Sequence, residues 1–404
     1  MVNKIFKREN LVNNAILFFA IFPLIPNNTK GLPVILLFLA VLLSNIKKHI
    51  NWKWLLINSS LFLTYLISLS YTENFNIGLK KLETGLSILI IPIIFFGLIA
   101  QHSFNKTLKT KFFKFFIFSS FCFSAYSLFF IVTDTTTNYY SDWYTDKFRV
   151  IVTEMPFIGQ HPIYASIFLS ISVIFFVELI KNNSIKTKYV YILFTSVNVL
   201  LLLMIMSKGV VLGLLLSVFI GLLKNFRKSK FIIISLICVV ISLLVFNRRV
   251  KEIFKAEMYS EINENFSTSI RVGIYKCAIK VIGEEFILGY GIGDSQRALN
   301  LCYSNYSNVL LKNRYNSHNQ YLDIFIKTGF FGFFIFLYFL YMNFSKACKN
   351  ENKLMIILLI FYCVLFLTEN ILVRQSGVIL FFFLLSFLSS INKTNSTQIK
   401  TNGD

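Results

Sequence analysis

The sequence predicts an all-α polytopic membrane protein with about twelve transmembrane helices and a large outer, periplasmic loop that contains short helices. Of its 404 residues, 55% are hydrophobic and only 15% are charged, whereas soluble proteins average about 45–50% apolar and about 25% charged residues. The apolar runs are continuous and often approach the ~20 residues that a helix needs to cross a bilayer. A transmembrane β-barrel would instead show strands of about ten residues with alternating hydrophobicity.

Twelve apolar runs are the expected spans. They lie at residues 11–26, 31–46, 54–70, 85–100, 112–132, 162–180, 189–206, 209–223, 231–246, 329–344, 354–368 and 376–390. The runs at 209–223 and 231–246 are slightly shorter than the usual 17–25 residues. An alternative for residues 189–223 is a tight hairpin whose turn, Ser207-Lys208-Gly209, lies partly within the outer half of the membrane.

The positive charge of the chain, a net +21, is concentrated in short segments between the apolar runs. Lys and Arg in short loops favour the cytoplasmic side of a membrane, so we expect a cytoplasmic N-terminus and a cytoplasmic tail at 391–404. Nine spans then fall in residues 1–246 and three in residues 329–390, and the long loop 247–328 faces the periplasm of a bacterial inner membrane. Basic residues in these places favour anionic membrane lipids as partners, and nucleic acid is not expected as a partner.

The outer loop contains one clear amphipathic pattern. Apolar residues recur at helical spacing from Ile270 to Ile282, which predicts a helix that ends at Gly283. We expect this helix to lie on the outer membrane surface or against the transmembrane bundle. Cys277 and Cys302 fall in the same loop, where they could form a disulfide in an oxidising compartment or remain free thiols.

The rest of this loop shows turn signals. The run Gly289–Asp294 predicts a flexible turn. A last short helix is expected from His318 to Lys327, with Ser317 as its N-cap. Gly329 would end this helix just before the next span.

Several kinds of chemistry are absent from the sequence. It contains no phosphate-binding loop of the ATPase type, no Cys/His metal cluster and no pair of Asp residues separated by one position, so neither a cofactor nor a metal ion is expected. The glycines at 289–293 follow no strand, which makes a plain turn a better interpretation than a dinucleotide loop. The outer face does collect cations and a histidine, and Arg can grip a phosphate group with two parallel hydrogen bonds. This set suits an anion with a lipid tail.

Three short motifs carry a resemblance to a known family. They are Gly289-Tyr290-Gly291-Ile292-Gly293, Ser317-His318-Asn319-Gln320-Tyr321-Leu322 and Lys327-Thr328-Gly329-Phe330-Phe331-Gly332, preceded by Arg271 in its helix. Together they resemble the signature region of the bacterial O-antigen ligase and O-antigen polymerase superfamily, over about residues 190–345.

The resemblance implies an activity. It implies transfer of a saccharide from an undecaprenyl-diphosphate carrier to an acceptor hydroxyl, without a metal ion, at a site under the large periplasmic loop. We place a ligase first, with the lipid A core as acceptor. A polymerase that joins lipid-linked repeats and an enzyme of protein O-glycosylation stay open as alternatives within the superfamily.

The resemblance also implies roles for individual residues. Arg271 would bind the diphosphate and His318 would act near the attacking hydroxyl, while Lys208 stands in a turn where the family often has Arg. The expected site comprises Arg271 and His318 as catalytic residues, Lys208, Arg271, Arg314 and Arg374 as diphosphate ligands, and Asn319, Gly291 and Gly293 as residues that orient the substrate. A histidine in the first turn of a helix feels the positive end of the helix dipole, which favours a neutral base near pH 7.

Structural alternatives apply to each of these residues. His318 could merely orient a substrate, and Arg271 could be a surface arginine at the membrane interface. We expect Arg374 to pair with Glu369 somewhat more readily than to contact a ligand. His161 could line the cavity that the expected site residues form. A histidine at this place is more commonly an N-terminal cap, here of the span at 162–180.

A different class of function is a carrier that moves a lipid-linked saccharide across the bilayer. Such a carrier is expected to place charged or broken-helix sites near the midplane of the membrane, in two related halves. The sequence shows no convincing internal repeat, and its informative polar residues gather in one outer loop. These features favour the enzyme.

Overall fold

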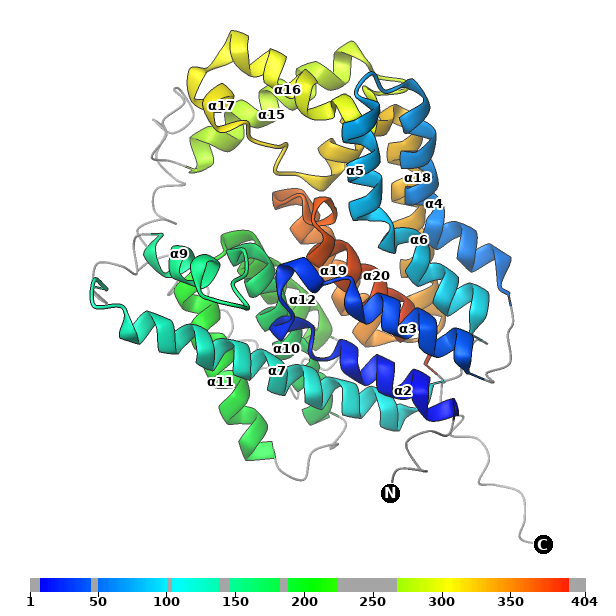
Figure 1. The fold of residues 1–404 in the computed structure, drawn as a ribbon, viewed down its shortest axis with the longest axis vertical. Helices are drawn as coiled ribbons and strands as arrows, with labels where there is room; N and C mark the ends of the chain where they lie inside the picture. The colour runs from blue at the N-terminus through cyan, green and yellow to red at the C-terminus, as the bar shows by residue number, and fades with distance from the viewer. Residues whose placement is uncertain are drawn as a thin grey trace, which may run out of the picture.

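The computed structural model describes residues 8–44, 50–99, 104–137, 146–181, 188–223 and 267–391. Across these ranges the chain is helical, apart from an isolated β-bridge between Phe104 and Ile391, so the all-α prediction is confirmed for them. Figure 1 shows a large group of helices with a smaller group, α15 to α17, at one end. The expected span at 231–246, the loop residues 247–266 and the tail from residue 392 lie outside the described ranges.

The larger group, which we call the bundle, contains most of the helices. Its members are α2 (Arg8–Phe19), α3 (Leu32–Leu43), α4 (Trp52–Ser68), α5 (Phe75–Gly85), α6 (Ser87–Pro92), α7 (Lys106–Thr133), α9 (Lys147–Glu154), α10 (Pro162–Lys181), α11 (Lys188–Ile205), α12 (Lys208–Leu223), α18 (Gln320–Lys349), α19 (Lys353–Thr368) and α20 (Gln375–Ser389). Short segments join or extend them: η1 (Phe22–Leu24), η2 (Asn27–Thr29), η3 (Leu69–Tyr71), the π-helical η4 (Ile93–Leu98) and η7 (Ile371–Val373).

By length and composition the chain is a multi-pass membrane protein. Among the described residues, six helical stretches are long and apolar enough to cross a membrane: Trp52–Tyr71, Phe75–Leu98, Lys106–Thr133, Pro162–Ile180, Lys188–Ile205 and Gln320–Lys349. Five shorter apolar helices accompany them: Asn10–Phe19, Asn27–Leu43, Lys208–Gly221, Lys353–Thr368 and Gln375–Ser389. Each expected span inside the described ranges coincides with one of these helices, but the full set of twelve crossings stays a prediction.

The first expected span illustrates why some helices are short. Its helix ends at Phe19 because Pro23 and Pro26 follow, and proline lacks the N–H that a continuing helix would need. Two 3₁₀ turns then carry the chain to α3. A helix broken in this way offers fewer residues to cross a bilayer than the apolar run suggests.

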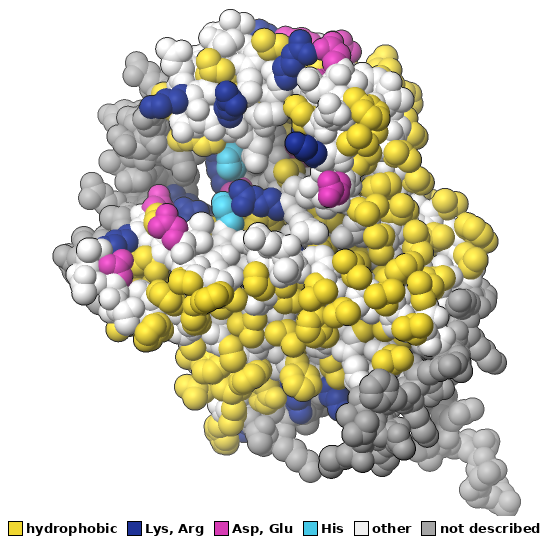
Figure 2. Space-filling model, in the orientation of Figure 1, with side chains coloured by type: hydrophobic (Ala, Val, Ile, Leu, Met, Phe, Trp, Pro, Cys, Tyr) yellow, Lys and Arg dark blue, Asp and Glu magenta, His cyan; other side chains and the backbone are white. Residues whose placement is uncertain are grey.

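The bundle core is built around α20, whose residues from Ser376 to Ser389 are all buried. Its Phe383 ring stacks on Phe19, with 3.7 Å between the ring centroids, and lies within 6 Å of the rings of Phe95 and Phe112. Aromatic pairs of this kind add to the free energy gained by burial alone. Figure 2 shows hydrophobic side chains over much of the bundle on the face turned to the viewer, as expected for a surface that faces lipid.

The smaller group, which we call the cap, consists of α15 (Ser267–Glu284), α16 (Gly291–Tyr306) and α17 (Asn308–Asn313). The amphipathic helix expected in this region is confirmed as α15. Of the two positions expected for it, on the membrane surface or against the transmembrane bundle, the structure shows contact with the bundle, through Leu322 and Ile326 of α18. Ile274, Cys277 and Val281 are buried in a second core with Tyr303 and Leu310 of the neighbouring cap helices, because α16 and α17 offer an apolar surface that covers this face of α15.

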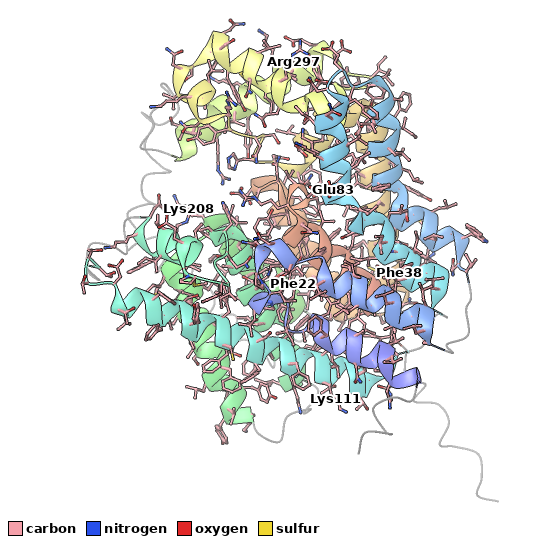
Figure 3. The ribbon with its side chains drawn as sticks, in the orientation of Figure 1. Phe22, Phe38, Glu83, Lys111, Lys208 and Arg297 are labelled. Atoms are coloured by element: carbon pink, nitrogen blue, oxygen red, sulfur yellow. A yellow bond between two sulfur atoms is a disulfide. The ribbon has the colours of Figure 1, made fainter. Side chains whose placement is uncertain are left out.

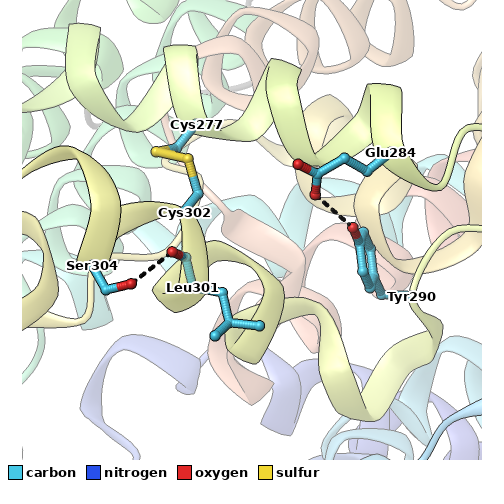
Figure 4. Close-up of a disulfide and its surroundings, with 6 residues drawn as sticks. All are labelled: Cys277, Glu284, Tyr290, Leu301, Cys302 and Ser304. Atoms are coloured by element: carbon cyan, nitrogen blue, oxygen red, sulfur yellow. Dashed lines mark hydrogen bonds between the residues drawn. A yellow bond between two sulfur atoms is a disulfide. The ribbon is translucent and has the colours of Figure 1, made fainter.

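A disulfide fixes α15 to α16. Cys277 and Cys302 are bonded, with their Cα atoms 5.7 Å apart, as Figure 4 shows. Of the two alternatives left open by the sequence, the structure has the disulfide. The bond closes a segment of 25 residues and thereby restricts the unfolded chain of the cap.

The expected flexible turn at Gly289–Asp294 is instead packed and partly helical. Gly289 and Gly291 have φ angles of +69° and +78°, which glycine adopts without the strain that a side chain would add. A Cβ atom on Gly289 would lie 2.6 Å from the carbonyl oxygen of Ile326. The glycines therefore allow the close approach that lets α16 begin directly at Gly291.

The cap is clamped to the turn between α4 and α5. Asp294 accepts hydrogen bonds from the Thr72 hydroxyl at 2.7 Å and from the backbone N–H of Glu73 at 2.6 Å. Lys81 Nζ donates to the carbonyl oxygen of Ile292 at 2.9 Å, and the Tyr71 hydroxyl donates to that of Leu288 at 2.7 Å. These bonds fix the position of the cap above the bundle.

Candidate active site

The site is organised by an elbow, residues 369–374, that joins α19 to α20. The Asn370 side-chain amide donates to the Ser317 hydroxyl at 3.0 Å, and the backbone N–H of Leu372 donates to Gln320 Oε1 at 2.7 Å. The Tyr164 hydroxyl of α10 donates to the carbonyl oxygen of Ile371 at 3.3 Å. The elbow is therefore held between the start of α18 and the start of α10.

Glu369, the first residue of the elbow, joins two of the predicted site residues. One of its carboxylate oxygens lies 2.5 Å from Arg271 Nη2, and the other lies 3.0 Å from His318 Nδ1. Arg271 also donates from Nη1 to the carbonyl oxygen of Thr368 at 2.9 Å. The structure thus brings Arg271 and His318 together through a carboxylate.

The environment of Glu369 keeps this carboxylate ionised. Its residue surface is only 9% exposed, and burial alone would raise the pKa of the carboxyl group. The hydrogen bond from His318 and the positive charge of Arg271 outweigh burial and lower the pKa below its ordinary value. A negative charge is thus available at neutral pH to orient both partners.

The expected pairing of Arg374 with Glu369 was wrong. Among the described residues, the ion pairs of Glu369 are with Arg271 and His318. Arg374 lies at the far end of the elbow, where it is exposed. Its guanidinium group forms no hydrogen bond or ion pair within the part of the chain that the structure describes, so its charge is open to a ligand.

His318 lies in a tight turn just before α18, and the predicted place in the first helical turn was wrong. Its φ angle is +42°, and its backbone N–H donates to Asn316 Oδ1 at 3.0 Å. The N-cap is Asn319, whose Oδ1 accepts from the N–H groups of Tyr321 and Leu322. The predicted N-cap, Ser317, instead bonds to Asn370 and to the carbonyl oxygen of Asn319, because the elbow offers its hydroxyl a competing partner.

This geometry indicates the protonation pattern of the His318 ring. A carboxylate oxygen at 3.0 Å favours a proton on Nδ1, which leaves the lone pair of the neutral ring on Nε2. The ring is partly exposed, and the Tyr275 hydroxyl donates to the His318 carbonyl oxygen at 3.3 Å. A neutral imidazole held in this way can accept a proton from a hydroxyl group.

Lys208 lies close to this cluster, at the break between α11 and α12; the tight hairpin considered for 189–223, with its turn inside the membrane, stays a prediction. Helix α11 ends at Ile205 and α12 begins at Lys208. Gly209 packs so closely on Thr368 that a Cβ atom there would lie 2.2 Å from the threonine hydroxyl. The hairpin turn therefore lies beside the residue that precedes Glu369, and Figure 3 shows Lys208 at the end of α12 nearest the cap.

The other predicted residues have different surroundings. Arg314 is exposed in the turn after α17, with a φ angle of +46°. Gly291 and Gly293 are buried against the α4–α5 turn, where the N–H of Gly293 donates to the Thr72 hydroxyl at 2.9 Å. Both polar atoms of the Asn319 side chain have partners: its oxygen caps α18, and its nitrogen donates to the carbonyl oxygen of Leu367. The substrate roles of these residues stay predictions.

Glu369 is the residue that the sequence analysis missed as part of the site. It appeared there only as a partner for Arg374, because a single carboxylate after an apolar run has the pattern of an ordinary loop residue. Its contacts with Arg271 and His318 join positions 98 and 51 residues away in the chain. The usable signal was that Glu369 directly follows a span that the sequence predicts to end on the same side as the outer loop.

The fold and the site define a helical, multi-pass membrane protein with a polar site between its bundle and a cap of short helices. Residues 191–337 match the family model described as O-antigen ligase. This part of the chain is therefore a domain of the O-antigen ligase family, and the predicted resemblance is confirmed. The match includes Lys208, Arg271 and His318, whereas Glu369 and Arg374 follow it. No curated protein matches the chain.

Proposed function

We propose that the protein is a glycosyltransferase of the O-antigen ligase type. It moves a saccharide from an undecaprenyl-diphosphate carrier to an acceptor hydroxyl, with the lipid A core as the first candidate acceptor, on the periplasmic face of the inner membrane. The family suggests an activity of the ligase or polymerase type. The observation that carries the proposal is the bridge from His318 through Glu369 to Arg271.

In this mechanism His318 is the base. Its Nε2 takes the proton of the acceptor hydroxyl while the hydroxyl oxygen attacks the anomeric carbon of the donor sugar. Glu369 holds the proton on Nδ1 and stabilises the positive imidazolium ring that forms. General-base assistance of this kind typically contributes on the order of 10²–10⁴-fold to the rate.

Cationic side chains serve the leaving group. The bond from the anomeric carbon to the diphosphate oxygen breaks, and the electron pair leaves with the lipid diphosphate. Arg271, which shares part of its charge with Glu369, acts here together with Arg374 and Lys208, and the positive charge of all three stabilises this anion. Fixed cations near a developing negative charge lower the free energy of the transition state more than that of the ground state. We therefore expect transfer without a metal ion.

The ordered base favours an enzyme over a carrier. A protein that only moves a lipid needs affinity for its head group but no group that removes a proton from an alcohol. A buried carboxylate bonded to one nitrogen of a partly exposed imidazole is the arrangement typical of acid–base catalysis. The experiment below therefore also tests whether the protein is a carrier.

The test is reconstitution of the full chain in lipid bilayers with an undecaprenyl-diphosphate saccharide and an acceptor. Release of lipid diphosphate and formation of the glycosidic bond are both measured, without added nucleotide or metal. We expect His318→Ala and Arg271→Ala to insert and fold but to lose most of the transfer. Lys276→Ala is the matched control, since Lys276 is exposed on the same helix as Arg271 and contacts the ring of Tyr306.

Three results would redirect the proposal. Full activity in His318→Ala would remove this residue from the mechanism. Movement of the lipid without a new glycosidic bond would favour the carrier. Glycan chains that lengthen without a lipid A core would favour the polymerase.

A further inference from the structure

His161 lies close to the far end of the elbow. It immediately precedes α10, and Tyr164 of the same helix donates from its hydroxyl to the Ile371 carbonyl oxygen. The Tyr164 ring also lies 6.0 Å from the His161 ring. Since Arg374 follows Ile371 by three residues, this contact places His161 and Arg374 in the same region of the bundle.

Charged residues at both ends of the elbow, Glu369 and Arg374, act on the His161 ring. The charges that act on its ring include Arg374 and Arg149, and also Glu369 and His318. His161 and His318 are the histidines that the structure describes, and Figure 2 shows histidine side chains above and below a hollow between the cap and the bundle, with Lys and Arg side chains beside them. The charges of Glu369 and His318 that act on the His161 ring relate it to the same polar region as the bridge.

The charge around His161 is positive and incompletely balanced. Arg149 is paired with Asp146 at 3.0 Å, and Glu369 is occupied by Arg271 and His318. Arg374 has no such partner within the described ranges. The bundle side of the hollow thus holds an unbalanced guanidinium group next to an imidazole ring, which suits an anion.

His161 can donate a hydrogen bond without becoming charged. Burial, together with the positive charges of Arg374 and Arg149, lowers the pKa of the ring to about 4, so it is neutral at pH 7. The backbone N–H of Ile163 points at Nδ1 from 3.4 Å, which favours the proton on Nε2. Among the described residues Nε2 has no hydrogen-bond partner, so this N–H is available to a ligand.

We propose that His161 binds the diphosphate of the lipid-linked donor, beside Arg374, on the bundle side of the hollow. The two ends of the elbow then have separate tasks. Glu369, at its first residue, and His318 serve the acceptor hydroxyl, whereas Arg374, at its far end, and His161 hold the leaving group. Helices α10 and α20 both begin beside this pair, and the positive ends of their dipoles add to the attraction for an anion. This inference rests on the proposed function, because it names the part of the donor that this side of the hollow holds.

The experiment measures binding and turnover separately in the full chain. Binding of undecaprenyl diphosphate, without any saccharide or acceptor, is measured by titration of the protein in nanodiscs, with undecaprenyl monophosphate as a second probe. A hydrogen bond to a charged group is typically worth enough to change an affinity by roughly 10- to 100-fold. We expect His161→Ala to raise the Kd for the diphosphate by this factor and to lower kcat/KM for the donor by at least as much.

Two further variants make the result specific. His161→Gln keeps a neutral N–H donor, so we expect it to recover most of the affinity; it also serves if His161→Ala does not fold. His318→Ala is expected to differ in the binding measurement, with a large loss of kcat and an almost unchanged Kd for undecaprenyl diphosphate. The melting temperature of each ligand-free variant checks that its fold is intact.

The outcomes distinguish this inference from the proposed function. A folded His161→Ala variant with wild-type affinity for undecaprenyl diphosphate overturns the inference even if transfer is observed. Binding that depends on His161 in a protein that forms no glycosidic bond supports the anion site and overturns the proposed transfer. A change in KM for the acceptor alone would place His161 on the wrong half of the hollow and would also overturn the inference.

Discussion

Replacement of Glu369 by glutamine tests the core of the site with the smallest change in shape. The variant keeps the length of the side chain but removes the charge between Arg271 and His318. Its amide nitrogen would donate to His318 Nδ1 and thereby favour the proton on Nε2, the nitrogen that must accept the hydroxyl proton. Loss of general-base assistance then predicts a decrease in kcat of about 10²- to 10⁴-fold, or about 3–5 kcal/mol in activation free energy.

The assay is single-turnover release of lipid diphosphate with saturating donor and acceptor, which reports the chemical step. Tyr275→Phe is a useful control, because it removes a hydroxyl that donates to the His318 backbone and leaves the carboxylate in place; we expect a much smaller loss. A Glu369→Gln variant that folds and keeps a wild-type rate would refute the assigned role of this carboxylate.

The same residue predicts a dependence of stability on pH. The folded protein lowers the pKa of Glu369 below its ordinary value near 4.5. A carboxylate with a lowered pKa stabilises the fold fully above its unfolded pKa and loses this contribution as the pH falls through the folded pKa. The difference in melting temperature between the wild type and Glu369→Gln should therefore be largest near neutral pH and shrink in acid below about pH 4.

Three other changes have defined outcomes. Cys277→Ser with Cys302→Ser should destabilise the cap by about 2–4 kcal/mol and make it sensitive to limited proteolysis, while the bundle stays protected. Gly329→Ala should lower the melting temperature and the yield of folded protein, because Gly329 has a φ angle of +61° and a Cβ atom there would lie 2.2 Å from the Ile287 carbonyl oxygen; an unchanged melting temperature would contradict the packing. Lys208→Arg should retain transfer and Lys208→Ala should raise the KM for the donor, since the site needs a positive charge at this turn. Equal kinetics in both variants would exclude a contact between residue 208 and the donor diphosphate.

The apolar patterns predicted much of the fold. They located the bundle helices inside the described ranges, the break between α11 and α12, and the buried face of α15. They could not identify what covers that face, because periodicity shows that a surface is apolar but not which surface it meets. For the same reason α15 was expected on the membrane surface or against the bundle, and the cap core that buries much of its apolar face was not predicted.

The site was predictable to a smaller extent. Family motifs drew attention to Arg271 and His318, and the structure places both within reach of one carboxylate. Glu369 could not be predicted as their link, because a contact between residues far apart in the chain exists only once α15, α18 and α19 have packed. Asn319 displaced Ser317 as the N-cap of α18 for a similar reason, since the hydroxyl of Ser317 finds its partner on the elbow.

The bond between α15 and α16 also bears on how the chain is oriented in its membrane. Disulfides persist in oxidising compartments and are rare where glutathione and thioredoxin keep thiols reduced. A cap that emerges outside the cell's reducing interior would acquire this bond, whereas a cap that faced inward would keep two thiols open to alkylation. The redox state of Cys277 and Cys302 in living cells therefore reports the sidedness of the protein by chemistry that is independent of where its lysines and arginines lie.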